Sequence, residues 1–297
     1  MAAYRDELQR LHIQLEDIIQ WFFEVYLKEE FGAEGFTYTP PSLGTTYIEK
    51  CKLLASATDG VLKQYRLFSE DGKVDRELLE MSSEHVFFRD IPSFIANKYA
   101  YANSAEIRRE MDLLFSDQSI LHYTEKTGSD YQTLPHMLQS VEMYQEDFAH
   151  YQKDAINWLI ERGSVQIGDK GQLQINKARV VLLGDLYYHE VICPSYYNGS
   201  YLQQLESLVQ TKEICYESTL FSRPEQDYLN YILNRSNFSN GLDLRNKYIH
   251  DTCPLYENMR TQDYMELLKI MILIIIKINE EFCLKGYHLQ KSCTPQC

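Results

Sequence analysis

Three side chains that can act together on a phosphodiester lie within six positions of one another. The segment Arg245-Asn246-Lys247-Tyr248-Ile249-His250 brings a guanidinium, an amide and an imidazole close together. A guanidinium supplies a fixed positive charge to a phosphate, and an imidazole moves protons near neutral pH. The pattern therefore indicates phosphodiester cleavage without a metal or cofactor, with Arg245, Asn246 and His250 as the candidate catalytic residues.

The flanking residues predict that this segment is a helix. The turn signal Ser239-Asn240-Gly241 precedes it and Pro254 follows it, so we expect a helix from Gly241 to Thr252 with Asn240 as its N-cap. Residues five apart on a helix differ by about 140° in direction and about 7.5 Å in height. Arg245 and His250 therefore do not share one face, and a single copy makes an incomplete phosphate clamp.

The segment resembles the arginine, four to six residues, histidine signature of the HEPN superfamily, in the form with a polar residue directly after the arginine. The resemblance covers residues 198–288 and implies an up-and-down four-helix bundle. It also implies a ribonuclease in which two copies meet in a homodimer through this bundle, so that two arginines and two histidines converge. Some family members carry a modified tyrosine two residues after the histidine, but Thr252 occupies that position here.

The resemblance assigns a role to each polar side chain. His250 would act as general base or acid on the ribose 2′-hydroxyl or the leaving 5′-oxygen, and Arg245 would hold the phosphate and stabilise the transition state. Asn246 would orient the histidine or the phosphate. Lys247 and Tyr248 are weaker candidates for RNA contacts, and Tyr248 is equally compatible with a place in the core. The products would be a 2′,3′-cyclic phosphate and a 5′-hydroxyl, and DNA would resist because it lacks the 2′-hydroxyl.

Two other interpretations remain open. An arginine on a helix often pairs with an acid, and Asp243 and Asp251 are near in sequence; the bundle would then be a non-catalytic RNA-binding or protein-interaction module. The triplet Asp71-Gly72-Lys73 has the acid-x-lysine spacing of some metal-dependent nucleases, but it lies in a hydrophilic turn without a strand before it. The chain contains no phosphate-binding loop of the GxxxxGK[ST] type.

Composition and charge describe a globular protein with an acidic N-terminal part. The 297 residues are 44% hydrophobic and 24% charged, with a formal net charge of −14. Residues 200–297 hold 10 Lys and Arg against 12 Asp and Glu, whereas residues 1–199 hold 19 against 31. The acidity argues against a broad basic surface for nucleic acid. The acidic residues 1–150 are instead a candidate regulatory region that restrains the enzyme, blocks its site by mimicking RNA, or binds a protein partner.

Several absences favour a cytoplasmic protein. The N-terminus has no apolar run of the signal-peptide type, and the longest apolar stretch, Leu267 to Ile278, is too short for a membrane span of about 20 residues. The seven cysteines are odd in number and scattered, which fits a reducing compartment. Cys293 and Cys297 have no accompanying ligand pair and indicate a loose tail.

The hydrophobic pattern predicts a mainly α fold in four parts. We expect a helical N-terminal region over 1–150, a small winged-helix-like α+β segment with one β-hairpin over 151–197, the HEPN-like bundle over 198–288 and a flexible tail over 289–297. The winged-helix-like segment either contacts nucleic acid or serves only for packing. The expected elements are helices at 4–30, 47–67, 76–82, 93–101, from 104, 135–150, 154–163, 178–191, 200–217, from 224 and 261–284, with strands at 165–167 and 173–175.

Overall fold

The chain folds into two compact units, each with its own hydrophobic core. The computed structural model describes residues 7–8, 10–42, 44–81, 86–235, 238–249 and 256–292, and the description of side chains stops at residue 286. Unit 1 joins Met1–Ala96 to Ser218–Cys297, and unit 2 is Asn97–Glu217. This division differs from the predicted boundaries at 150 and 198, because segments from both ends of the chain share one core.

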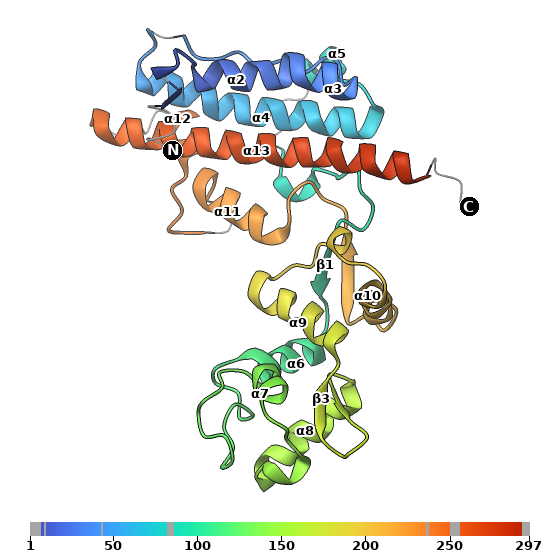
Figure 1. Ribbon diagram of the computed structural model, residues 1–297. Helices are drawn as coiled ribbons and strands as arrows, with labels where there is room; N and C mark the ends of the chain where they lie inside the picture. Colours follow the sequence, from blue (N-terminus) through green and yellow to red (C-terminus); the bar gives the residue numbers. More distant parts are fainter. Residues whose placement is uncertain are drawn as a thin grey trace. The chain divides into compact units, whose positions relative to one another are not determined.

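Helices form most of the described part of unit 1, as predicted for the chain (Figure 1). They are α2 (Leu15–Trp21), a π-helical turn (Phe22–Tyr26), α3 (Leu27–Phe31), α4 (Tyr47–Asp71), α5 (Arg76–Met81), a 3-10 turn (Phe88–Asp90), α11 (Arg223–Leu233), α12 (Leu244–Ile249) and α13 (Glu257–Ser292). The single helix predicted over 4–30 is interrupted before α2, where His12 has a φ of 58°. The helix predicted over 261–284 extends further in both directions.

Helix α4 lies in the core of unit 1 and is capped at both ends. Thr46 and Glu49 form a capping box at its start, and Gly72 ends it with a φ of 73°, a conformation that glycine adopts without strain. Asp71-Gly72-Lys73 is therefore the end of a helix rather than the end of a strand, so the structure gives no strand context to the triplet considered as a metal-dependent nuclease motif.

The helices α2–α3, α4 and α13 run in the same direction. Tyr264 near the start of α13 donates a hydrogen bond to Glu16 at the start of α2 over 2.5 Å, and Phe282 further along α13 stacks on Phe31 at the end of α3. Tyr65, late in α4, bonds Glu281, late in α13. The loop of residues 32–46 makes this possible, because an extended chain of that length spans up to about 50 Å and can return along the helices.

This arrangement changes the interpretation of the N-terminal region. Residues of α2, α3 and α4 contribute much of the core that also buries α13. Removing residues 1–150 would expose the apolar side of α13 and the core, so that region is not a separable regulatory domain. Residues 293–297, the end of the predicted tail, lie outside the described residues.

Unit 2 contains the predicted β-hairpin and a second pair of strands that the sequence did not indicate. Strands β2 (Val165–Ile167) and β3 (Leu173–Ile175) pair antiparallel between α8 (His150–Arg162) and α9 (Lys177–His189). Strands β1 (Tyr99–Ala102) and β4 (Ile214–Glu217) pair antiparallel at the two ends of the unit. The other helices are α6 (Ala105–Phe115), α7 (Leu134–Ser140) and α10 (Ser200–Gln210).

Three predicted helices are corrected in this unit. The helix expected over 93–101 is not formed, because residues 94–97 make a bend and a turn and β1 begins at Tyr99. The helix expected over 200–217 stops at Gln210 and is followed by β4. The helix expected over 135–150 is α7 alone, and α8 begins at His150. Helix α10 belongs to unit 2, so the four helices predicted over 198–288 do not form one bundle.

A buried ion network joins the helices of unit 2. Glu110 on α6, with no exposed surface, accepts hydrogen bonds from Arg179 at 2.7 and 2.8 Å, from Arg162 at 2.9 Å and from Ser164. Arg162 and Arg179 also contact Glu213. Burial raises the pKa of Glu110, but the hydrogen bonds and charges of Arg179, Ser164 and Arg162 outweigh it, so its net pKa lies below the ordinary value.

Candidate functional site

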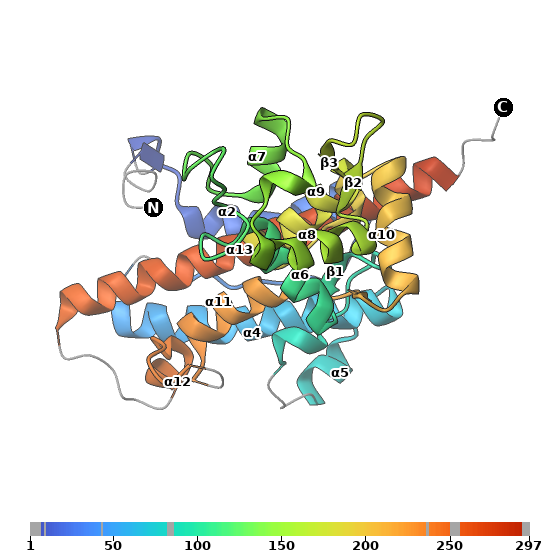
Figure 2. The same ribbon diagram turned by 90° about the horizontal axis from the view of Figure 1, so that it is seen from below.

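The candidate segment forms α12, a short helix that packs against α4 (Figures 1 and 2). It begins at Leu244 rather than at Gly241, because Asp243 has a φ of 55° and cannot continue a right-handed helix backwards. The preceding backbone is tied to α11, since Leu242 N–H donates to the Tyr231 carbonyl over 2.8 Å. A Cβ at Gly241 would lie 2.7 Å from the same carbonyl oxygen, so this close approach requires glycine.

Asn246 bonds the side chain of the residue just before its own helix. Its Nδ2 donates to Oδ1 of Asp243 over 2.7 Å. Asp243 also pairs with Arg235, whose Nε lies 3.3 Å from its Oδ2. One of the two acids expected beside the motif is therefore engaged, but with Asn246 and Arg235 rather than with Arg245. The other, Asp251, lies outside the described residues.

Arg245 is held by an acid from a distant part of the sequence. Its Nη2 lies 2.6 Å from Oδ2 of Asp59 on α4, and the two side chains are 20% and 17% exposed. The Nε of Arg245 is buried and has no hydrogen-bond partner among the described residues. The guanidinium is thus held at Nη2 by Asp59, and the side chain as a whole stays 20% exposed.

Lys247 and Tyr248 both reach Asp263 on α13. The Lys247 ammonium lies 3.3 Å from Oδ2, and the Tyr248 hydroxyl donates to the same oxygen over 2.8 Å. Burial, the hydrogen bond to Asp263 and the neighbouring Cys51 raise the pKa of Tyr248 well above its ordinary range. Tyr248 is fully buried, so it offers no ring face to a base, and of its two predicted roles the structure supports packing.

The structure brings the motif's described side chains together with two acids that sequence reasoning did not identify, Asp59 and Asp263. Neither acid is near the motif in sequence, and no local pattern marks them. His250 lies outside the described residues. Within the described part of the chain, no group of three or more His, Cys, Asp or Glu side chains is arranged to hold a metal ion.

Removing the Tyr248 hydroxyl should destabilise unit 1. Tyr248→Phe leaves Asp263 with one hydrogen-bond donor fewer, and the loss should lower the free energy of unfolding by about 2 kcal/mol. Urea unfolding followed by tryptophan fluorescence measures this value. Tyr256→Phe is a matched control, because Tyr256 is 70% exposed and its substitution should have no effect. Equal stability of Tyr248→Phe and wild type would contradict the assigned bond.

The stability difference between wild type and Tyr248→Phe should depend on pH in alkaline solution. Because the pKa of Tyr248 is raised on folding, its stabilising contribution is complete below the unfolded value of about 10 and is lost as the pH rises above it. The stability difference between wild type and Tyr248→Phe should therefore shrink above pH 10, which urea midpoints measured across that range would show. If the stability difference stayed constant with pH, the pKa of Tyr248 would be unchanged on folding, as for a solvent-exposed tyrosine.

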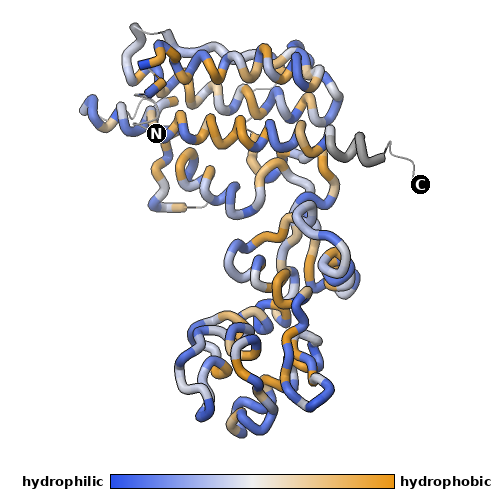
Figure 3. Tube along the Cα trace, viewed as in Figure 1, coloured by the Kyte–Doolittle hydropathy of each residue, from blue (hydrophilic) through white to orange (hydrophobic). Residues whose placement is uncertain are grey.

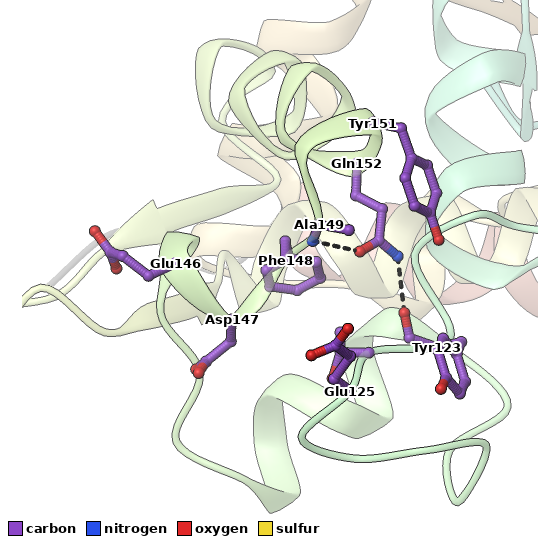
Figure 4. A pocket seen from close by; sticks show the side chains of 9 residues that line it. Tyr123, Glu125, Glu146, Asp147, Phe148, Ala149, Tyr151 and Gln152 are labelled. Atoms are coloured by element: carbon purple, nitrogen blue, oxygen red, sulfur yellow. Dashed lines mark hydrogen bonds between the residues drawn. The ribbon is translucent and has the colours of Figure 1, made fainter.

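Unit 2 has a separate surface pocket of about 240 Å³ at the start of α8 (Figure 4). The Gln152 side-chain amide joins two backbone segments at this pocket. It donates to the Tyr123 carbonyl over 2.7 Å and accepts from Ala149 N–H over 2.8 Å. The lining residues are Tyr123, Thr124, Glu125, Glu146, Asp147, Phe148, Ala149, Tyr151 and Gln152. Three acids and no base in the lining repel a phosphate, so this pocket does not serve as an RNA site.

No helix of the described residues combines the length and the apolar character that a bilayer crossing needs. No protein-family model, curated protein or solved structure matches this chain.

Proposed function

We propose that the chain is a metal-independent endoribonuclease of HEPN type, with Arg245, Asn246 and His250 at a composite site shared by two copies. One observation carries the proposal. Arg245 and Asn246 lie on the helix Leu244–Ile249 of a mainly helical unit, and Arg245 is paired with Asp59 while its side chain stays 20% exposed. An arginine that is held by an acid and stays partly exposed is suited to a phosphate, because its planar fork is already oriented.

The proposed chemistry is attack by the ribose 2′-hydroxyl on the adjacent phosphorus. His250 takes the 2′-hydroxyl proton or returns a proton to the leaving 5′-oxygen, and Arg245 stabilises the extra negative charge on the phosphate. Positions five apart on an ideal helix face about 140° apart, so the proposal has a second copy supply the complementary Arg and His pair. Such an enzyme acts in the cytoplasm, in phage defence, as a toxin with an antitoxin partner, or in a stress response.

Asp59 has a place in this proposal as a positioning residue. A carboxylate on Nη2 neutralises part of the guanidinium charge, yet it also fixes the direction of the fork. A phosphate that binds the remaining edge would compete with Asp59 only in part.

The experiment incubates the full chain with end-labelled RNA in excess EDTA and identifies the product ends. Cleavage is expected, with 2′,3′-cyclic phosphate and 5′-hydroxyl ends, whereas DNA and RNA carrying 2′-O-methyl groups of the same sequence stay intact. Cleavage that requires added magnesium, or that also cuts DNA, would overturn the proposal.

A second function has its own supporting observation. Each described polar side chain of α12 is engaged within the unit: Arg245 with Asp59, Asn246 with Asp243, and Lys247 with Asp263. Such engagement favours a non-catalytic HEPN-like module that binds RNA or a protein through another surface. The same assay separates the two, since this module leaves every RNA intact.

A further inference from the structure

Helix α13 is apolar on all sides in its central part, yet one side is open to solvent. Between Ile270 and Ile276 every residue is apolar, as the continuous hydrophobic colour in the middle of α13 indicates (Figure 3). Ile270, Met271 and Ile274 are buried in the unit 1 core, but Leu273 is 39% and Ile276 is 55% exposed. A helix that is apolar all round is typical of one that is covered all round.

The exposed and partly exposed residues form a stripe with the spacing of a helix–helix seam. Its members alternate between steps of three and four residues, which keeps them on one side of the helix. They are Glu266, Lys269, Leu273, Ile276, Glu280 and Cys283. Within the chain Lys269 pairs with Glu266 at 2.6 Å, and Glu280 pairs with Lys277 at 2.9 Å. The Lys269 and Glu266 side chains are 41% and 31% exposed, and a pair of this kind contributes little and can exchange partners. Lys277 is only 14% exposed, but it also contacts Glu225 at 3.1 Å, so it keeps an acidic partner when Glu280 pairs with another chain.

The order of charges along the stripe fits a second copy running in the opposite direction. The midpoint between Leu273 and Ile276 is also the midpoint between Lys269 and Glu280. In an antiparallel pair with its two-fold axis at that point, Leu273 meets Ile276 and Lys269 meets Glu280 of the other copy, twice each. A parallel pair would instead place Lys269 on Lys269 and Glu280 on Glu280, so like charges would oppose it.

We propose that this stripe of α13 is a self-association surface that pairs antiparallel with the same stripe of a second copy. The apolar centre supplies the attraction, and the Lys269–Glu280 pairs fix direction and register. The stripe from Glu266 to Cys283 covers about 25 Å of helix, which gives the two copies a long line of contact.

This interface goes beyond the proposed ribonuclease site and differs from it in place. Asp263, which contacts Lys247 and Tyr248 of α12, lies about 17 Å along the helix from the two-fold axis. The two α12 helices would therefore be separated by about 35 Å along α13, too far to share one phosphate. A composite Arg/His site would require a contact on another face.

A reciprocal charge exchange tests the proposal. In Lys269→Glu and in Glu280→Lys, like charges meet twice across the axis, so self-association measured by sedimentation velocity should weaken about tenfold in each. An equimolar mixture of the two variants should associate as well as wild type, because every pair in the mixed dimer is again complementary. Lys277 keeps Glu225 at 3.1 Å in the second variant, so its local ion pair remains.

A cysteine placed in the stripe checks the register independently. Glu266→Cys puts a thiol opposite Cys283 of the other copy, and mild oxidation should join them, as peptide mapping would show. Within one chain these positions are about 25 Å apart and cannot bridge. Gln262→Cys, one turn away on the same side, should not form that link.

A wild type that stays monomeric, single variants that associate normally, or a mixture that does not recover would each overturn the proposal. None of these readouts depends on RNA cleavage, so failure here is distinct from failure of the proposed function.

Discussion

Alanine in place of Arg245 or His250 should abolish RNA cleavage while unit 1 remains folded. Loss of the general acid or base should lower the cleavage rate about 10²- to 10⁴-fold, and loss of the arginine about 10²- to 10³-fold. Arg245→Lys keeps the charge but loses the fork and should also be impaired. Single-turnover cleavage of end-labelled RNA in EDTA measures all three rates.

Stability must be measured beside activity, because Arg245→Ala removes the arginine partner of the mostly buried Asp59 carboxylate. The variant should therefore lose about 1–3 kcal/mol of unfolding free energy. Asp59→Asn combined with Arg245→Ala removes both charges and should recover part of that loss. If Arg245 serves only as a structural partner of Asp59, the double variant regains its fold and any cleavage activity; if it binds phosphate, the double variant stays inactive.

Mixing the two inactive variants tests whether the site is shared. A dimer of one Arg245→Ala chain with one His250→Ala chain retains one arginine and one histidine, contributed by different copies. A composite site should therefore regain part of its activity in the mixture. A site that is complete within each chain would remain inactive, and that outcome would contradict the shared cleft.

The sequence predicts local structure well wherever the signal is local. The hairpin predicted from alternating apolar and polar residues at 165–167 and 173–175, around Gly168 to Gly171, is confirmed as β2–β3. It could be predicted because the turn and both strands lie in one short stretch. The helix expected from residue 104 is confirmed as α6, and Ser104 is its cap, with its side chain accepting from Ile107 N–H.

Long-range pairing could not be predicted in the same way. Strands β1 and β4 have four residues each and pair across more than a hundred positions, as Tyr99 with Glu217 shows. Neither strand has a turn partner nearby, and short apolar runs do not distinguish strand from helix. Likewise, the hydrophobic periodicity of α13 does not show that this helix packs on α4. The predicted bundle used only helices from the last hundred residues, whereas in the structure α13 packs on a helix from the opposite end of the chain.

The candidate site likewise contains residues that the local sequence indicates and partners that only the tertiary structure reveals. Arg245 and Asn246 could be chosen from residue type and spacing, but the acids that hold the helix come from α4 and α13. Sequence reasoning named Asp243 and Asp251 as acids near Arg245, and the described one, Asp243, bonds Asn246 and Arg235 instead. The partner of a long side chain is set by tertiary packing, which brings Asp59 within reach.

Removing the carboxylate of Glu110 should destabilise unit 2 more than any other single change considered. Glu110→Ala leaves Arg179, whose side chain is 7% exposed, without its bidentate partner. Breaking a buried pair on one side costs about 3–5 kcal/mol, a large part of the stability of a domain of this size. Hydrogen exchange of α6, α8 and α9 amides, with urea unfolding, measures the loss separately from unit 1.

Two further variants show whether the loss arises from an unpaired charge. Glu110→Leu combined with Arg179→Leu removes both partners and should restore much of the stability, because hydrophobic groups can replace a buried ion pair at little cost. Glu110→Gln keeps the shape and an acceptor but removes the charge, so its loss should be intermediate. A double variant as unstable as Glu110→Ala would mean that packing, rather than charge, holds these helices together.

The pH dependence of the same variants follows from the lowered pKa of Glu110. A carboxyl group whose pKa falls on folding stabilises the protein above its unfolded value of about 4.3, and this contribution is lost as the pH falls through the folded value. Wild type should therefore lose stability in acid faster than Glu110→Gln, and the gap between them should close below about pH 4. Because Glu110 holds α6 to α8 and α9, the acid-sensitive part of the chain should be unit 2, which carries the β2–β3 hairpin.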